Sequence, residues 1–192
     1  MMLPATTELL LIRHAPALTE GRIAGRRDVA ADCSDGVAIA ALRAAVGGFD
    51  HLVISPALRC RQTASALWPD LGPLADARLW EQDFGAWEGV AFADLPDLGP
   101  LPLNDLAAHC PPQGESFAML CNRVRPGLSD AAALGGRVVV VAHAGTVRAA
   151  VAQACGSTPA GLAFQIAPLS LTRIIGAPEG PWSVAQVNAV AR

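Results

Sequence analysis

Two histidines and two arginines stand where their side chains could act together on an anion. Arg13 and His14 directly follow the apolar run LLLI, His143 directly follows VVVVA, and Arg59 comes shortly after HLVI. A neutral imidazole is a good nucleophile toward phosphorus, and a guanidinium presents a planar fork of donors that matches phosphate oxygens. These residue types therefore indicate a site that binds and attacks a phosphate group.

Such side chains need a scaffold that brings them together, and the chain alternates short apolar runs with longer helical patterns. The buried strands are predicted at residues 9–12, 52–54 and 138–142, with two further strands at 169–175 and 183–190. Helices are predicted at 34–46, 58–68, 115–134 and 146–154. Pro126 and Gly127 are expected to kink or break the third helix. The predicted fold is a single-domain three-layer α/β/α sandwich with a mostly parallel sheet, spanning residues 1–192.

The predicted strands place the reactive residues at one edge of the sheet. In an open α/β sheet, ligands bind beyond the carboxyl ends of the strands, and each following helix adds backbone N–H groups there. One histidine at a strand end is more often structural than catalytic, and Arg59 with Arg61 alone would be a solvated helix face. Because His14, Arg59 and His143 fall together at three strand ends, we favour a catalytic role over the structural one. His51 and His109 lack such a context and are expected to be ordinary surface or loop residues.

The composition limits the class of protein. The 192 residues are 52% hydrophobic and 16% charged, which excludes a disordered chain. The net charge is −3, so nucleic acid and anionic membranes are not expected partners, and an anionic ligand needs a local cluster of cations. All 14 basic residues are arginine.

The cysteines and the N-terminal segment suggest a compartment. The five cysteines form no CxxC pair and their number is odd, which favours a reducing environment and makes zinc an unexpected ligand. The start MMLPATTELLLIRH lacks the basic and long apolar regions of a signal peptide, and no segment has 18 uninterrupted apolar residues. We expect a cytoplasmic protein.

Four sequence blocks, taken together, resemble the histidine phosphatase superfamily, also called the phosphoglycerate mutase-like superfamily. They are IRHA with Arg13 and His14, SPALRCRQTA with Ser55, Arg59 and Thr63, LWEQDFGAWEG with Glu81, and VVVVAHAGTVRA with His143. The blocks occur in the family's order between residues 9 and 150. The joint match is specific, although each block alone is weak or moderate.

The resemblance implies a metal-independent phosphatase with no cofactor. His14 would become phosphorylated, while Arg13, Arg59 and a protonated His143 would hold the non-bridging oxygens and so replace magnesium. Glu81 would protonate the leaving group and then deprotonate water, with Asp83 and Glu88 as weaker candidates for that role. Ala144, which follows His143, belongs to the expected substrate-binding set.

The first block departs from the family pattern. Ala15 replaces the usual glycine, Pro16 replaces a frequent glutamate, and residues 17–21 contain no asparagine to contact the phosphate. Arg22 or Arg26 is the expected replacement, and Arg26 is included among the substrate-binding residues.

The substrate is less defined than the reaction. FGAWEG followed by GESFAMLCNRV is most similar to the alpha-ribazole phosphatases of cobalamin biosynthesis, although GESF is equally typical of a helix start. The expected partner is a small phosphomonoester, and a homodimer is left open.

The alternatives are a phosphoglycerate mutase-like enzyme or sugar phosphatase, a protein phosphohistidine or phosphotyrosine phosphatase, and a silent phospholigand-binding relative. An irregular excursion at about residues 92–112 argues against a protein substrate. The absence of Lys and Arg between Glu81 and Arg123, together with the short stretch after the last strand, argues against a mutase.

Overall fold

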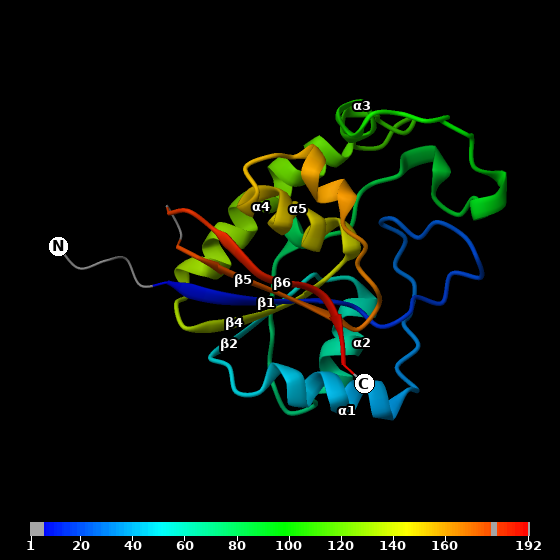
Figure 1. The fold of residues 1–192 in the computed structure, drawn as a ribbon. Helices are drawn as coiled ribbons and strands as arrows, with labels where there is room; N and C mark the ends of the chain where they lie inside the picture. Colours follow the sequence, from blue (N-terminus) through cyan, green and yellow to red (C-terminus); the bar gives the residue numbers. More distant parts are fainter. Residues whose placement is uncertain (1–5, 178–179, 192) are drawn as a thin grey trace.

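The computed structural model describes residues 6–177 and 180–191, which form one six-stranded sheet with helices on both faces (Figure 1). The strands are β1 (Thr7–Arg13), β2 (His51–Ile54), β3 (Leu74–Ala75), β4 (Arg137–Ala142), β5 (Ser170–Gly176) and β6 (Ser183–Val190). The α-helices are α1 (Gly36–Val46), α2 (Leu58–Leu67), α3 (Leu103–Ala108), α4 (Phe117–Ala133) and α5 (Ala144–Ala154). Residues 1–5 of the N-terminal segment lie outside the described part of the chain.

The sheet has the strand order β3-β2-β4-β1-β5-β6. The pairs β1–β4, β2–β4 and β2–β3 are parallel, whereas β5 and β6 add to one edge in antiparallel fashion. Helices α4 and α5 cover one face of this sheet and helices α1 and α2 cover the other (Figure 1). The predicted three-layer α/β/α sandwich with a mostly parallel sheet is confirmed.

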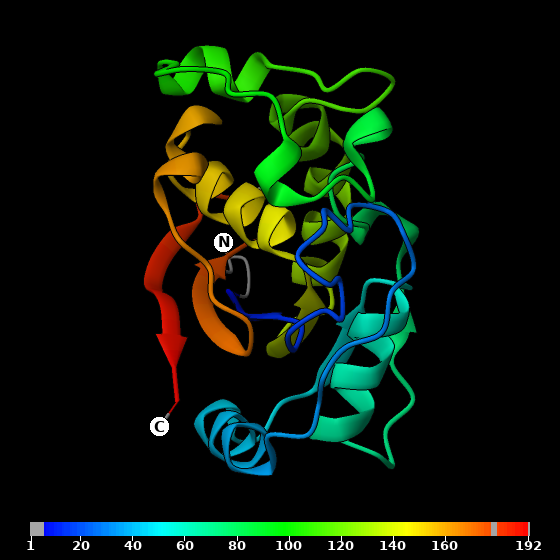
Figure 2. The ribbon, with the colours of Figure 1, turned by 90° about the vertical axis from the view of Figure 1, so that its right-hand side faces the viewer.

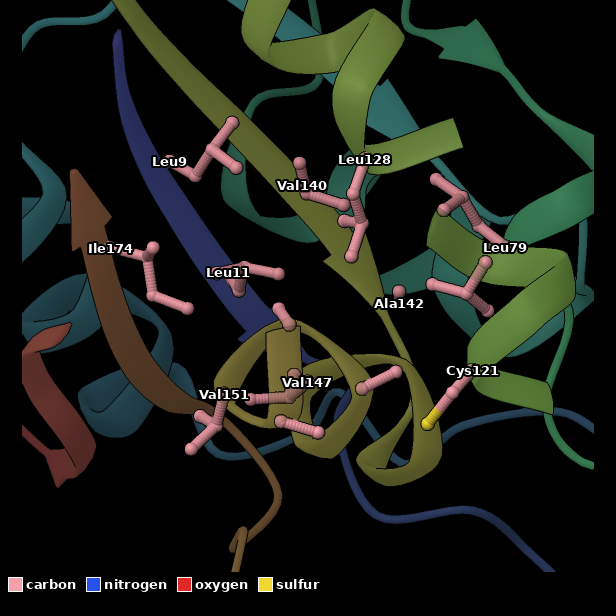
Figure 3. Packing of buried hydrophobic residues seen from close by; sticks show 14 of the residues in the cluster. Leu9, Leu11, Leu79, Cys121, Leu128, Val140, Ala142, Val147, Val151 and Ile174 are labelled. Carbon is pink, nitrogen blue, oxygen red and sulfur yellow. The ribbon is translucent and has the colours of Figure 1, made fainter. Parts of the chain in front are cut away.

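The centre of the sheet is apolar on both faces because helices cover it on both sides. The four consecutive valines of β4, residues 138–141, are fully buried, with alternate side chains in the two core layers. On one face, Leu9 and Leu11 of β1 pack with Val147 and Val151 of α5 (Figure 3). This packing fixes where α5 begins relative to the ends of the strands.

The register of the central strands brings their carboxyl ends to one level. Arg13 pairs with Ala142, and Ile54 pairs with Val141, so β1, β2 and β4 end side by side. The segments that follow β1 and precede α4 therefore lie at the same edge of the molecule, which faces the viewer in Figure 2. Residues from distant parts of the sequence meet there.

The predicted helices and strands agree with the structure to within about two residues at each end, with one correction. Helix α4 continues unbroken through Pro126, so the expected break is absent. Residues on both sides of the proline, including Val124 and Leu128, are buried in the core, and this packing holds the helix together despite the missing N–H group. Gly127 lies so close to Asp76 and Leu79 that its lack of a side chain permits the contact.

Several short elements were absent from the sequence prediction, among them β3, α3 and a 3₁₀ turn. Strand β3 has two residues, too few for a recognisable alternation of apolar and polar side chains. The excursion at 92–112, expected to be irregular, contains a 3₁₀ turn at Phe92–Asp94 and the helix α3. Within the described residues, no helix is long and apolar enough to cross a membrane.

Candidate active site

A cavity of about 490 Å³ opens beside the carboxyl end of β1. Its polar lining comes from the end of β1, from the first loop (residues 14–35), from α2 and from the segment after β3. The polar lining residues are Arg13, His14, Thr19, Arg22, Arg59 and Glu81. Three arginines at one cavity in a protein of negative net charge provide the local cationic cluster that an anion requires. The cavity is therefore the candidate site.

His14 lies almost completely buried at this cavity. Its backbone N–H donates to the carbonyl of Ala142, which continues the β1–β4 pairing beyond the strand. Its Nδ1 lies 2.6 Å from the carbonyl oxygen of Ala15, which can only accept, so this contact assigns the proton to Nδ1. Nε2 is then left with a free electron pair, as a nucleophile requires.

The same surroundings keep the ring of His14 neutral. Burial lowers its pKa to about 3, the hydrogen bond to Ala15 opposes this, and the nearby charges of Arg59 and Arg13 lower the pKa further. At neutral pH the electron pair of Nε2 is therefore available rather than protonated.

Arg59 in α2 is fully buried next to His14. Its Nε donates to His14 Nε2 at 3.3 Å, while Nη1 and Nη2 donate to the carbonyl oxygens of Arg27 and Gly25 at 2.9 and 2.7 Å. Thr63, one turn later in α2, donates to the carbonyl of Arg59 and accepts from the N–H of Ala15. Helix α2 thus holds both the histidine and the first loop.

The guanidinium group of Arg13 supplies a second positive charge at the cavity. Its Nη1 donates to the carbonyl of Ile166 at 2.6 Å, but its buried Nε has no partner. Burial lowers the pKa of this guanidinium from its ordinary value, although Glu81 partly compensates. An unpartnered buried donor on a cation is a group whose hydrogen bonding an anion would complete.

His143 lies behind His14 and is not among the residues that line the cavity. The two rings pack edge to face with centroids 5.2 Å apart, and His143 Nε2 lies 2.8 Å from Ser55 Oγ. Burial lowers the pKa of His143 well below its ordinary value, and the neighbouring His14 and Arg59 side chains act in the same direction. This lowered pKa favours the neutral form of the ring, and the protonated His143 expected during the reaction stays a prediction. A dianion nearby would raise this pKa.

Trp80 and Cys60 complete the surroundings of His143. The indole of Trp80 lies nearly parallel to the imidazole at 6.3 Å between centroids, and the guanidinium carbon of Arg59 lies 6.0 Å from the Trp80 ring. The thiol of Cys60 is 3.6 Å from His143 Nε2, and burial raises its pKa to about 12. Neither residue was predicted at the site, although both lie inside the recognised sequence blocks.

Glu81 lines the cavity and also contacts the beginning of α5. Its Oε1 accepts from the N–H groups of Gly145 and Gln82 at 3.1 and 3.0 Å. A Cβ atom at Gly145 would overlap the Glu81 carboxylate and Leu120, so only glycine permits this approach. Ala144, the first residue of α5, is partly buried and does not line the cavity.

Arg123 of α4 holds the segment that carries Glu81. Its Nη1 donates to the carbonyls of Arg78 and Trp80, and Nη2 donates to the carbonyl of Glu81. The same guanidinium forms an ion pair with Glu115, which also accepts from the N–H of Asp83. This role of Arg123 was not predicted from the sequence. Its only signal was GESFAMLCNRV, where Ser116 is indeed the N-cap of α4.

The candidates to replace the missing asparagine lie in different places. Arg22 lines the cavity, and its Nη1 donates to the carbonyl of Gly89 at 2.9 Å. Arg26 does not line it, and its guanidinium lies 3.7 Å from the carboxylate of Glu115. Of the two, the geometry favours Arg22. Its direct neighbour in the sequence, Ile23, pairs with Gly89 and Val90 through backbone hydrogen bonds.

The remaining candidates have structural partners. The carboxylate of Glu88 accepts from the N–H groups of Arg26 and Phe84, and Asp83 accepts from the N–H of Gly85, so both stabilise loops. His109 stacks on Trp87 away from the cavity. Within residues 6–177 and 180–191, no group of three or more His, Cys, Asp and Glu side chains is arranged to hold a metal ion.

The chain is similar to known proteins in sequence and in fold. Residues 9–189 match the family model of the histidine phosphatase superfamily (branch 1). A bifunctional protein of Mycobacterium tuberculosis is 37% identical over 150 residues, covering 71% of this chain and 41% of that protein, so the chain spans about two fifths of that relative. A mycobacterial glucosyl-3-phosphoglycerate phosphatase has a TM-score of 0.81 and 25% identity over 96% of this chain and 99% of its own. A candidate alpha-ribazole-5'-P phosphatase of Escherichia coli shares the fold, with a TM-score of 0.80 and 21% identity over 96% and 97% of the two chains.

The chain therefore belongs to branch 1 of the histidine phosphatase superfamily. The family and the solved phosphatases of the same fold support a phosphatase.

Proposed function

We propose that this domain hydrolyses phosphomonoesters through a phosphohistidine on His14. The observation that carries the proposal is the hydrogen bond of His14 Nδ1 to the Ala15 carbonyl, which leaves Nε2 unprotonated among the arginines of the cavity. A neutral imidazole next to cations is a nucleophile whose target is anionic.

The first step transfers the phosphoryl group to the enzyme. His14 Nε2 forms a bond to phosphorus as the bond to the ester oxygen breaks, and Arg13 and Arg59 stabilise the charge on the equatorial oxygens. The dianion raises the pKa of His143, which then contributes a further positive charge. Ala144, at the start of α5, is kept as a proposed substrate contact through its backbone N–H, although it does not line the cavity. This cationic set serves in place of a metal ion.

The reaction needs one group that first gives up a proton and later takes one back, and a carboxyl group can do both. Glu81 gives its proton to the leaving oxygen, and its carboxylate then takes a proton from the water that attacks the phosphohistidine. The bond between phosphorus and Nε2 breaks, inorganic phosphate leaves, and the imidazole returns to its neutral form. Glu81 is favoured over Asp83 and Glu88 because it lines the cavity and they do not.

A trapping experiment tests the phosphohistidine. Brief incubation with a ³²P-labelled monoester should give an acid-labile, base-stable phosphoenzyme, and His14→Ala should give none and lose turnover of p-nitrophenyl phosphate. His51→Ala, outside the cavity, is the matched control and should behave as the wild type. Retention of a tenth of the rate by His14→Ala would contradict the proposal.

Chelation tests the absence of a catalytic metal. After exhaustive dialysis against EDTA, the rate with p-nitrophenyl phosphate should be unchanged. Loss of activity that magnesium or zinc restores would show that the arginines and histidines do not suffice.

The substrate is proposed to be a small phosphomonoester, with alpha-ribazole 5'-phosphate as the first candidate because of the sequence resemblance described above. A panel with this ester, sugar phosphates and phosphoglycerates tests the assignment by phosphate release. Hydrolysis is favoured over mutation because, among the described residues, the cavity is lined by three cations. Arg13 and Arg59 are assigned to the reacting phosphoryl group and Arg22 to the place of the missing asparagine, which leaves no cation for a second anionic group. Formation of 2-phosphoglycerate from 3-phosphoglycerate plus catalytic 2,3-bisphosphoglycerate, faster than phosphate release from any ester, would contradict this.

The setting of the protein is also a proposal. All five cysteines are free thiols, which supports the expected reducing, cytoplasmic compartment.

Arg26 is retained only as a residue that stabilises the loop through Glu115, since Arg22 is the better placed of the two arginines.

A further inference from the structure

The cavity is divided into two chemically different parts. One set of lining residues is the cations around His14, whereas the other set forms an apolar wall that includes Pro16, Ile23, Phe84, Phe92 and Pro168. A phosphate group occupies little of a cavity of about 490 Å³, so most of the volume is left for the group attached to it. The apolar wall is therefore the surface that a leaving group in this cavity would contact.

Backbone hydrogen bonds between two loops hold this wall in place. The N–H of Ile23 donates to the carbonyl of Val90, the N–H of Gly89 donates to Ile23, and the N–H of Phe92 donates to Gly21. Arg22 and Ala91 also form a β-bridge. Ile23 and Phe92 thus face the cavity from a paired segment rather than from two independent loops.

Phe92 has an unusual environment for an aromatic residue. Its side chain is 61% exposed although it lines the cavity. Phe84, from the segment that carries Glu81, lines the same cavity. A wall with exposed aromatic surface gains stability when a flat apolar group covers it, because both surfaces leave water.

The charges at the wall do not favour a second anionic group on the substrate. Arg22 is the one cation lining the cavity beyond those near His14, and the carbonyl of Gly89 already accepts from its Nη1. The guanidinium of Arg26 is directed to Glu115 instead. A carboxylate or second phosphate here would be partly desolvated against proline, isoleucine and phenylalanine side chains.

We propose that Ile23, Phe84 and Phe92 form a leaving-group subsite for a flat, apolar ring, and that this subsite disfavours monoesters with a second acidic group. The inference rests on the proposed function for the position of the phosphate, and it adds the chemical class of the leaving group.

Binding of phosphonates, which cannot be hydrolysed, tests the subsite without turnover. The probes are 2-phenylethylphosphonate, ethylphosphonate and 2-carboxyethylphosphonate, measured by calorimetry. We expect the phenyl compound to bind roughly tenfold more tightly than ethylphosphonate, and the carboxyl compound no more tightly than ethylphosphonate. In Phe92→Ala the affinity ratio of the phenyl compound to ethylphosphonate should fall by about fivefold, while the affinity for ethylphosphonate should be unchanged. In Phe92→Leu this ratio should be intermediate. Leu71→Ala removes a similarly exposed apolar side chain outside the cavity and should have no effect.

Turnover of the matching phosphates separates this inference from the proposed function. The esters 2-phenylethyl phosphate and ethyl phosphate both release a primary alkoxide, so their intrinsic reactivities are similar. Phenyl preference in binding without any turnover would refute the phosphatase proposal and leave the subsite in place. The subsite would be refuted if turnover occurred with no preference for the phenyl compound over the ethyl compound. It would also be refuted if 2-carboxyethylphosphonate bound more tightly than ethylphosphonate, or if Phe92→Ala weakened the binding of all three probes equally.

Discussion

Arg59 Nε donates to His14 Nε2 across 3.3 Å in the interior of the protein, while both Nη atoms bond to carbonyls of the first loop. One guanidinium therefore orients the candidate nucleophile and fixes the loop that surrounds the cavity. When a phosphoryl group arrives at Nε2, the Nε donor next to it is already in place. The site is organised for an anion before one binds.

Replacing Arg59 should affect the rate more than the binding of substrate. For Arg59→Ala, kcat/KM with p-nitrophenyl phosphate should fall by about 10² to 10³, since one preorganised donor contributes that much to transition-state stabilisation. The loss should appear mainly in kcat, as steady-state kinetics would show.

Arg61→Ala is the matched control for Arg59, because Arg61 lies two residues along the same helix and its side chain is half-exposed. Its guanidinium contacts Asp28 at 3.9 Å and donates to the carbonyl of Pro56, away from His14. It should change kcat by less than about twofold. A change in Arg59→Ala confined to KM would indicate ground-state binding instead.

The two buried histidines should make the folded state less stable as the pH falls. Burial lowers the pKa of His14 from 6.5 to about 3 and that of His143 in the same direction, so the unfolded chain binds protons that the folded chain does not. Below the unfolded pKa, the free energy of unfolding should decrease by up to about 1.4 kcal/mol per pH unit for each histidine. Urea titrations between pH 6.5 and pH 5 measure this change of the unfolding free energy with pH. Most carboxylates titrate below this range, so they contribute little to the slope.

Removing one of these histidines should flatten that slope. His14→Gln should reduce it by about half, whereas His51→Gln should leave it unchanged because His51 lies outside the buried site. An identical slope in His14→Gln and the wild type would mean that the His14 ring is not held neutral by folding.

The identity of the general acid should appear in the dependence on the leaving group. Glu81→Gln keeps a carbonyl oxygen to accept from the N–H of Gly145 but cannot give up a proton as the acid does. An alkyl phosphate should lose about 10² to 10⁴ in kcat, and p-nitrophenyl phosphate much less, because p-nitrophenolate needs little protonation.

Two neighbouring carboxylates serve as controls for Glu81. Asp83→Asn and Glu88→Gln should affect both substrates equally, since each carboxylate accepts from loop N–H groups. A selective loss with the alkyl ester in either variant would move the acid role away from Glu81.

Arg123 is predicted to act through Glu81 as a positioning residue. Arg123→Lys cannot donate at once to the carbonyls of Arg78, Trp80 and Glu81, so the carboxylate should lose its fixed position. We expect roughly tenfold lower kcat with an alkyl phosphate, little change with p-nitrophenyl phosphate, and unchanged KM. Arg125→Lys, an exposed arginine on the same helix, should show none of this. Equal losses with both esters would indicate a purely structural role.

The sequence alone determined the scaffold and the residue types of the site. Apolar runs such as VVVVA specify strands covered on both faces, and helical periodicity specifies the layers around them, because both signals are local. Residues that directly follow those runs, such as His14 and His143, could therefore be placed at one edge of the sheet. Strand β3 escaped because two residues carry no periodicity.

The tertiary structure decided what the sequence could not. Arg26 and Arg22 are equivalent in sequence, but the pairing of Ile23 with Val90 places Arg22 at the cavity and leaves Arg26 near Glu115. Likewise, the lowered pKa of His143 depends on burial, and the hydrogen bonds of Arg123 to the Glu81 segment join residues more than 40 positions apart. Such contacts follow from how the layers pack, which no local pattern of side chains specifies.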